Sequence, residues 1–193
     1  WLAPLMGQLY KHYPNLRIDL MLEERVLDLP MREADIAIRM KEPSQADLIR
    51  RRLMDVNIRF YASPDYLAQH GTPQTPEDMN KHRLICQNPS DPQVSAGAGW
   101  MAPFLARNES SLLTVNNYFG ILQAVRAGLG IGALPDYLTA DFPELVNVLP
   151  EEGSATVPVY LAYPEELRHS KRIAVFRDFV VDEVIAYRKK VQS

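Results

Sequence analysis

Cysteine is almost absent from this sequence, which has one, Cys86, among 193 residues. A single thiol excludes an internal disulfide framework and fits a reducing compartment. Cys86 ends the apolar run Leu84–Cys86, which predicts a strand. We therefore interpret it as a buried structural thiol rather than as a nucleophile or a redox sensor.

Long apolar stretches are also missing, since no run approaches the roughly 20 residues needed to cross a bilayer. The start does not resemble a signal peptide, because Pro4 and the polar residues from Gln8 onward interrupt an apolar core. Trp1 is not an initiator residue, so we expect the natural chain to begin upstream of it.

The sequence has no basic excess, with a formal net charge of -3 and an isoelectric point of about 5.8. Domains that bind DNA phosphates usually carry such an excess on one face. The one dense basic run is Arg50–Arg52, and a solvated strand edge explains it. We do not expect this chain alone to bind DNA.

Signals for catalysis, metals and cofactors are lacking as well. No nucleophile elbow or P-loop occurs, and adjacent acidic pairs such as Glu23–Glu24 are usually solvated. Metal-ligand spacing is absent among the four histidines, His12, His70, His82 and His169. The prediction is therefore no enzyme, no metal site and no cofactor.

Three alternate glycines, Gly128, Gly130 and Gly132, suggest a nucleotide-binding loop. Such a loop lies between a strand and the helix that follows it, whereas these glycines follow a predicted helix and enter a strand. Helix termination and close packing explain them better.

Helix and strand periodicities alternate from the beginning. Apolar spacing predicts a helix over Leu2–Tyr13, and strict alternation predicts a strand over Leu16–Leu22. The short apolar segment Asp35–Arg39 indicates a buried parallel strand, and Leu48–Ser63 is expected to be extended. Helices between strands are typical of a parallel α/β sheet.

The second half repeats this alternation. Ser63 and Thr75, each followed by proline, are expected helix caps, and Asn116 or Asn117 caps another helix. The further expected strands are Leu112–Val115, Ile131–Leu134, Leu145–Leu149 and Val157–Tyr163, and a last helix runs from Ile173 to Val191. These elements predict two α/β lobes, joined by extended crossings near residues 58–63 and 157–163, with a ligand cleft between them.

Five segments, in order, resemble the effector domain of LysR-type transcriptional regulators. They cover nearly the whole chain and are DIAIR (35–39), ASPDYLAQHGTP (62–73), PEDMNKH (76–82), QAVRAGLGIGALP (123–135), and YP at 163–164 followed by RHSKRI (168–173) and FRDF (176–179).

The resemblance implies two Rossmann-like lobes similar to type 2 periplasmic binding proteins. Lobe I is expected to comprise residues 1–61 and 163–193, and lobe II residues 62–162. It also implies a cytoplasmic homodimer or homotetramer, with no membrane partner, whose parent binds DNA through an N-terminal winged helix-turn-helix. The family's first strand and part of its pocket are expected before Trp1.

Effectors of the family are small and often anionic, and helix N-termini favour anions. The helix start at Asn116, Asn117 and Tyr118 is the best candidate site, although the asparagines could serve only as caps. Arg25 follows one predicted strand, and Arg39 with Met40 ends the next. An arginine at such a carboxyl strand end could bind a carboxylate or form a salt bridge to Glu23, Glu24 or Asp35. Asn88 and Ser90 are weaker candidates.

The sequence thus predicts an effector-sensing, dimerising domain that modulates DNA binding and transcription. The alternative is an exported solute-binding protein of a transporter, which would share the lobes and the cleft.

Overall fold

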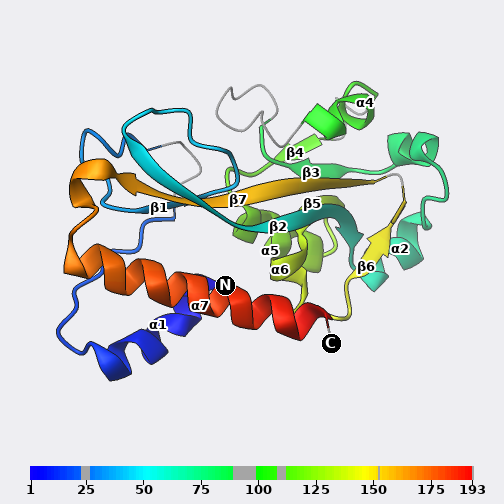
Figure 1. The fold of residues 1–193 in the computed structure, drawn as a ribbon. Coiled ribbons are helices and arrows are strands. Elements are labelled where there is room, and N and C mark those ends of the chain that lie inside the picture. The colour runs from blue at the N-terminus through cyan, green and yellow to red at the C-terminus, as the bar shows by residue number, and fades with distance from the viewer. Residues whose placement is uncertain (23–26, 89–98, 108–111, 152, 193) are drawn as a thin grey trace. The chain divides into compact units, whose positions relative to one another are not determined.

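The computed structural model describes residues 1–22, 27–88, 99–107, 112–151 and 153–192 (Figure 1). The chain forms two compact units, of which unit 1 comprises Trp1–Asp55 and Pro158–Ser193 and unit 2 comprises Val56–Val157. It passes from one unit to the other within two long strands, β2 (Leu48–Ala62) and β7 (Ser154–Pro164).

Unit 1 contains α1 (Leu2–His12), β1 (Ala37–Arg39), the 3-10 helix η4 (Glu165–Leu167) and α7 (Lys171–Gln192). Strand β7 lies between β1 and β2, and β1 pairs with it antiparallel, with Ile38 opposite Leu161. The expected buried parallel strand was therefore wrong on both points, since β1 is antiparallel and half-buried. Its neighbour is a strand that returns from unit 2 in the opposite direction, which the local sequence does not reveal.

The predicted strand over residues 16–22 is not formed. Its alternation is real, because Leu16, Ile18 and Leu20 are half-buried while Arg17 and Asp19 are exposed. A strand requires a hydrogen-bonded partner as well as a pattern, and none of the strands in the described part of the chain pairs with this segment.

Apolar side chains from β2, β7 and the turn before β1 form a small cluster in unit 1. Leu29, Leu48 and Ala162 are buried there, with Ala34 and Ala37 packed against them. Helix α7 has the predicted spacing, and its buried residues are Ile173, Phe176, Val180, Val181 and Val184.

The basic run on β2 is solvated, as predicted, with all three arginines exposed. Arg50 donates to the Pro43 carbonyl at 2.8 Å, and Arg52 pairs with Asp55 at 2.6 Å. Two of the three guanidinium groups therefore have acceptors within unit 1.

Unit 2 is built on a mixed sheet. Strand β3 (Leu84–Cys86) is parallel to β4 (Leu112–Thr114) and to β5 (Ile131–Pro135), whereas β2 is antiparallel to β5 and to β6 (Val146–Val148). Among its described residues the helices are α2 (Pro64–His70), η1 (Pro76–Lys81), η2 (Gly99–Met101), α4 (Ala102–Leu105), α5 (Tyr118–Arg126) and α6 (Asp136–Thr139).

Helix α5 packs on the sheet and contributes to a core cluster of unit 2 (Figure 1). Its apolar face, Ile121, Leu122 and Val125, meets Ile85 of β3 and Leu134 of β5, and all five are buried. The glycines after α5 fit the packing explanation. Gly128 has φ +73°, and a Cβ at Gly132 would overlap Val125 Cγ2.

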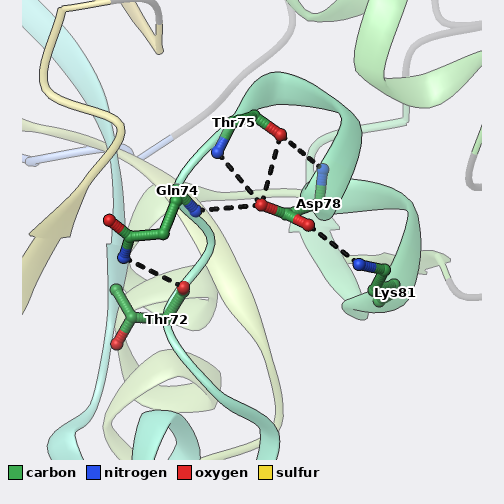
Figure 2. Close-up of polar contacts among 5 residues, drawn as sticks. All are labelled: Thr72, Gln74, Thr75, Asp78 and Lys81. Atoms are coloured by element: carbon green, nitrogen blue, oxygen red, sulfur yellow. Dashed lines mark hydrogen bonds and ion pairs between the residues drawn. The ribbon is translucent and has the colours of Figure 1, made fainter.

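Both hydroxyl caps predicted in unit 2 are present. Ser63 Oγ accepts from Tyr66 N, at the start of α2. Figure 2 shows the second cap, in which Thr75 Oγ1 accepts from Asp78 N and the Asp78 carboxylate accepts from Thr75 N at 3.1 Å and Gln74 N at 3.2 Å. Lys81 pairs with the same carboxylate at 2.9 Å. These bonds hold the 3-10 helix η1 at its amino end.

Candidate functional site

Two parallel strands of unit 2 end at the same edge of the sheet and lead into polar residues. Strands β3 and β4 pair in register, with Cys86 opposite Thr114, and Val115 N donates to Cys86 O at 2.9 Å. Gln87 and Asn88 follow the first strand, and Asn116 and Asn117 follow the second. We refer to these four residues as the amide edge. Carboxyl ends of parallel strands are where open α/β sheets bind ligands.

Asn117 is the N-cap of α5. Its Oδ1 accepts from Gly120 N at 2.7 Å, and its Nδ2 donates to Asn116 Oδ1 at 3.2 Å. A Cβ at Gly120 would lie 2.5 Å from Val115 Cγ1, so this turn packs tightly. The prediction that one asparagine caps the helix is therefore confirmed for Asn117. Asn116 is exposed, and Tyr118 is partly buried against the core of unit 2.

Gln87 is a residue that the sequence analysis did not select. Its Nε2 is buried and, within the described residues, has no hydrogen-bond acceptor. A buried donor without an acceptor is unfavourable by about 1–3 kcal/mol. The rule that polar residues at strand ends are candidate ligand contacts would have found Gln87, since it directly follows the apolar run Leu84–Cys86.

The remaining unit 2 candidates are less informative. Asn88 is exposed, and Ser90 lies outside the described residues. The structure thus brings Asn88, Asn116, Asn117 and Tyr118 to one edge, with Gln87 added.

The unit 1 candidates lie at the end of β1, where Arg39 is its last residue and Met40 follows it, both half-buried. Arg39 Nη2 donates to the carbonyl of Leu27, so the guanidinium holds the backbone of the preceding turn. Burial lowers the pKa of Arg39, and the nearby Asp28 carboxylate opposes this. No ion pair forms between Arg39 and a carboxylate of the described residues, Asp35 included, while Arg25, Glu23 and Glu24 lie outside them.

Neither a metal centre nor a reactive thiol is found in the part of the chain that the structure describes. No group of three or more His, Cys, Asp or Glu side chains there could hold a metal ion. Cys86 is 2% exposed, and burial raises the pKa of its thiol to about 11. No helix among these residues has the length and apolarity that a membrane crossing needs.

A mixed α/β sheet with polar residues at the carboxyl ends of two parallel strands is compatible with a ligand-binding domain. The family profile described as LysR substrate binding domain matches residues 1–184, and the chain therefore belongs to this family. The predicted family and fold class are confirmed.

Known relatives support the same assignment. The HTH-type transcriptional regulator CrgA of Neisseria meningitidis serogroup C is 33% identical over 188 residues, covering 95% of this chain and 62% of the relative. An uncharacterised HTH-type regulator of Haemophilus influenzae is 27% identical over 176 residues, covering 88% and 59%. The chain thus spans about three fifths of the length of these relatives.

Solved structures agree. The CrgA regulatory domain has a TM-score of 0.82 at 31% identity, covering 95% of this chain and 91% of that one. The effector domain of AmpR from Pseudomonas aeruginosa has a TM-score of 0.77 at 16% identity, which shows the shared fold alone.

Proposed function

We propose that this chain senses a small anionic metabolite for a LysR-type transcriptional regulator and that the amide edge of unit 2 is part of its effector site. The observation that carries this is the placement of four amide residues beside the N-terminus of α5, where they follow the carboxyl ends of the paired strands β3 and β4. Membership of the LysR substrate-binding family supports the general role.

The amide edge suits an anion with hydrogen-bonding oxygens. Amide NH₂ groups donate, and the first turn of α5 has its backbone N–H groups and the positive end of the helix dipole there. The buried Nε2 of Gln87 is a donor that a carboxylate oxygen would satisfy. Asn116 is the best direct contact, because Asn117 already caps the helix.

It stays a prediction that the effector contacts Arg25, Arg39, Met40, Asn88, Ser90 and Tyr118. It is likewise a prediction that the effector is held between the lobes. We assign lobe I to residues 1–61 and 163–193 and lobe II to residues 62–162, close to the two units. Effector binding acts by stabilising one of two arrangements, which requires a difference in affinity between them.

The parent protein is proposed to be a cytoplasmic homodimer or homotetramer that binds DNA through a winged helix-turn-helix and catalyses no reaction. CrgA and the Haemophilus protein are HTH-type regulators, which supports this. The alternative of an exported solute-binding protein has no support among these relatives.

A thermal-shift screen of the 193-residue chain against small mono- and dicarboxylates tests the effector class. A ligand present at a thousand times its dissociation constant adds roughly 4 kcal/mol to the free energy of unfolding. Dissociation constants for the best ligand are then compared between the wild type, Asn116→Leu and a control, Gln8→Leu, which places the same side chain on the exposed face of α1.

We expect Asn116→Leu to weaken binding at least tenfold and Gln8→Leu to leave it unchanged. Equal affinity in both variants would remove Asn116 from the site. Phosphorylated and neutral analogues are screened in parallel; if one of these binds while every carboxylate fails, the assigned effector class is wrong.

A further inference from the structure

A titratable pair lies inside unit 2, away from the amide edge. Tyr66 of α2 is 4% exposed, and His82, which follows η1, is 3% exposed. In the described part of the chain, His82 is the one buried histidine, whereas the others are exposed. Burial disfavours the charged form of histidine, so the free-energy cost of keeping His82 neutral rises as the pH falls.

The Tyr66 hydroxyl joins α2 to the segment that leads into β3. It lies 3.2 Å from His82 Nδ1, and it accepts from the backbone N–H of Arg83 at 3.2 Å. Arg83 directly precedes β3, and its carbonyl accepts from Ile131 N, the first residue of β5, at 2.9 Å. The hydroxyl therefore links α2 to the residue that precedes β3, and the backbone of that residue is itself bonded to β5.

Neutral His82 satisfies both hydrogen bonds of the Tyr66 hydroxyl. The imidazole then carries its proton on Nε2, and its Nδ1 accepts the single proton of the Tyr66 hydroxyl. The Tyr66 oxygen remains available to accept from Arg83 N–H. One donor and one acceptor thus meet at each contact.

Protonated His82 cannot keep this pattern. A solvent proton bound at Nδ1 turns that nitrogen into a donor, so that two N–H groups point at one phenolic oxygen. The hydroxyl proton then loses its acceptor, and the described residues provide no other partner for it. A buried donor or acceptor left without a partner destabilises the arrangement in which the Tyr66 hydroxyl contacts both His82 and Arg83, which we call the closed form.

The surrounding charges do not stabilise the imidazolium. Burial lowers the pKa of His82, and the positive forms of His70 and Lys81 lower it further, while Asp78 opposes them. The Asp78 carboxylate is already paired with Lys81 and the Thr75 cap (Figure 2). The Arg83 guanidinium adds positive charge near Tyr66 and donates to the Leu129 carbonyl. On η1, the Glu77 carboxylate is paired with Arg107 of the segment after α4 at 3.5 Å.

We infer that Tyr66 and His82 form an acid-sensitive contact, and that uptake of one proton by His82 releases α2 from the amino end of β3. The direction of the pH effect follows from the lowered pKa of His82 in the closed form. Stability of the closed form is complete above the ordinary histidine pKa of 6.5 and is lost as the pH falls below it. One proton changes the opening equilibrium by at most tenfold per pH unit, or about 1.4 kcal/mol.

Hydrogen exchange of the ¹⁵N-labelled 193-residue chain between pH 7.5 and 5.0 tests this contact. We expect the protection factor of the Arg83 amide, corrected for intrinsic exchange, to fall by up to tenfold per pH unit below 6.5. The Ile121 amide, which donates to Asn117 O in α5, should lose less. Imidazole ¹⁵N shifts should show the Nε2–H tautomer of His82 at pH 7.5.

Three variants give the controls. His82→Gln should abolish the pH dependence at Arg83, and Tyr66→Phe should lower protection at every pH. His169→Gln, an exposed histidine of unit 1, should behave as the wild type. Protection of Arg83 that is constant with pH in the wild type, or unchanged pH dependence in His82→Gln, overturns the inference. If His82→Gln does not fold, the wild-type profile and the His82 shifts decide.

Discussion

Replacing Gly132 with alanine is the sharpest test of how unit 2 is packed. The added Cβ would overlap Val125 Cγ2 and lie 2.9 Å from Ile121 Cγ2, well inside the usual carbon contact of about 3.5–4.0 Å. Both neighbours are fully buried and β-branched, so their rotamers cannot change freely.

The expected loss in the free energy of unfolding combines two opposing effects. Overpacking of a core costs about 1–3 kcal/mol, while replacing glycine restricts the unfolded chain and returns about 0.4–1 kcal/mol. We therefore expect Gly132→Ala to lower the free energy of unfolding by about 1–2 kcal/mol, measured by equilibrium urea unfolding with circular dichroism.

A double-mutant cycle with Val125→Ala makes the test specific. Val125→Ala alone should cost about 2 kcal/mol, from two methyl groups at about 0.8 kcal/mol each and the cavity that they leave. In the double variant, the methyl group introduced by Gly132→Ala occupies part of that cavity, so the total loss should fall short of the sum by at least about 0.5 kcal/mol. Gly7→Ala, where a Cβ meets nothing within 4 Å in α1, should be neutral or stabilising by up to about 1 kcal/mol. Additive losses in the cycle, or a Gly132→Ala variant as stable as wild type, would refute the packing argument.

Two further outcomes follow from the electrostatics. The hydrogen bond from Lys81, with those from Gln74 and Thr75, holds the pKa of Asp78 below its ordinary value. The ionised Asp78 carboxylate therefore stabilises the folded chain above about pH 4, and this stabilisation is lost as the pH falls below that. Asp78→Asn should therefore lower the melting temperature at pH 7 and by less at pH 3.5; a constant difference contradicts this. Because Cys86 is buried and the pKa of its thiol is raised to about 11, a thiol-reactive disulfide reagent should leave the native chain unmodified at pH 7.5 and label it only in denaturant. Fast labelling of the native chain would show that the thiol is accessible.

Elements with local signals were predicted well from the sequence. Ser63 and Thr75 cap helical segments as expected, and the apolar spacing of α7 matches its buried face. In these cases the sequence pattern and the hydrogen bond or packing contact lie within a few residues of each other. The capping of α5 by Asn117 belongs to the same class.

Two predictions that required a particular distant partner failed. Residues 16–22 have the alternation of a strand but no ladder, and β1 pairs antiparallel with β7, which places Ala37 opposite the distant Ala162. Alternation reports which side chains are buried, not which backbone lies beside them. The pairing partner and its direction are therefore not encoded locally.

Strand pairing also explains why the candidate site residues of unit 2 and those of unit 1 differ as evidence for effector binding. At the amide edge, the parallel pairing of β3 and β4 brings Asn88 and Asn116 to one side of unit 2, so the strand-end rule has a geometric basis. Arg39 also ends a strand, but its neighbour is antiparallel, and its guanidinium bonds to the carbonyl of Leu27. A half-buried guanidinium must place its donors on acceptors whether or not a ligand is present. Its position at a strand end is thus weaker evidence for effector binding than that of an exposed amide such as Asn116.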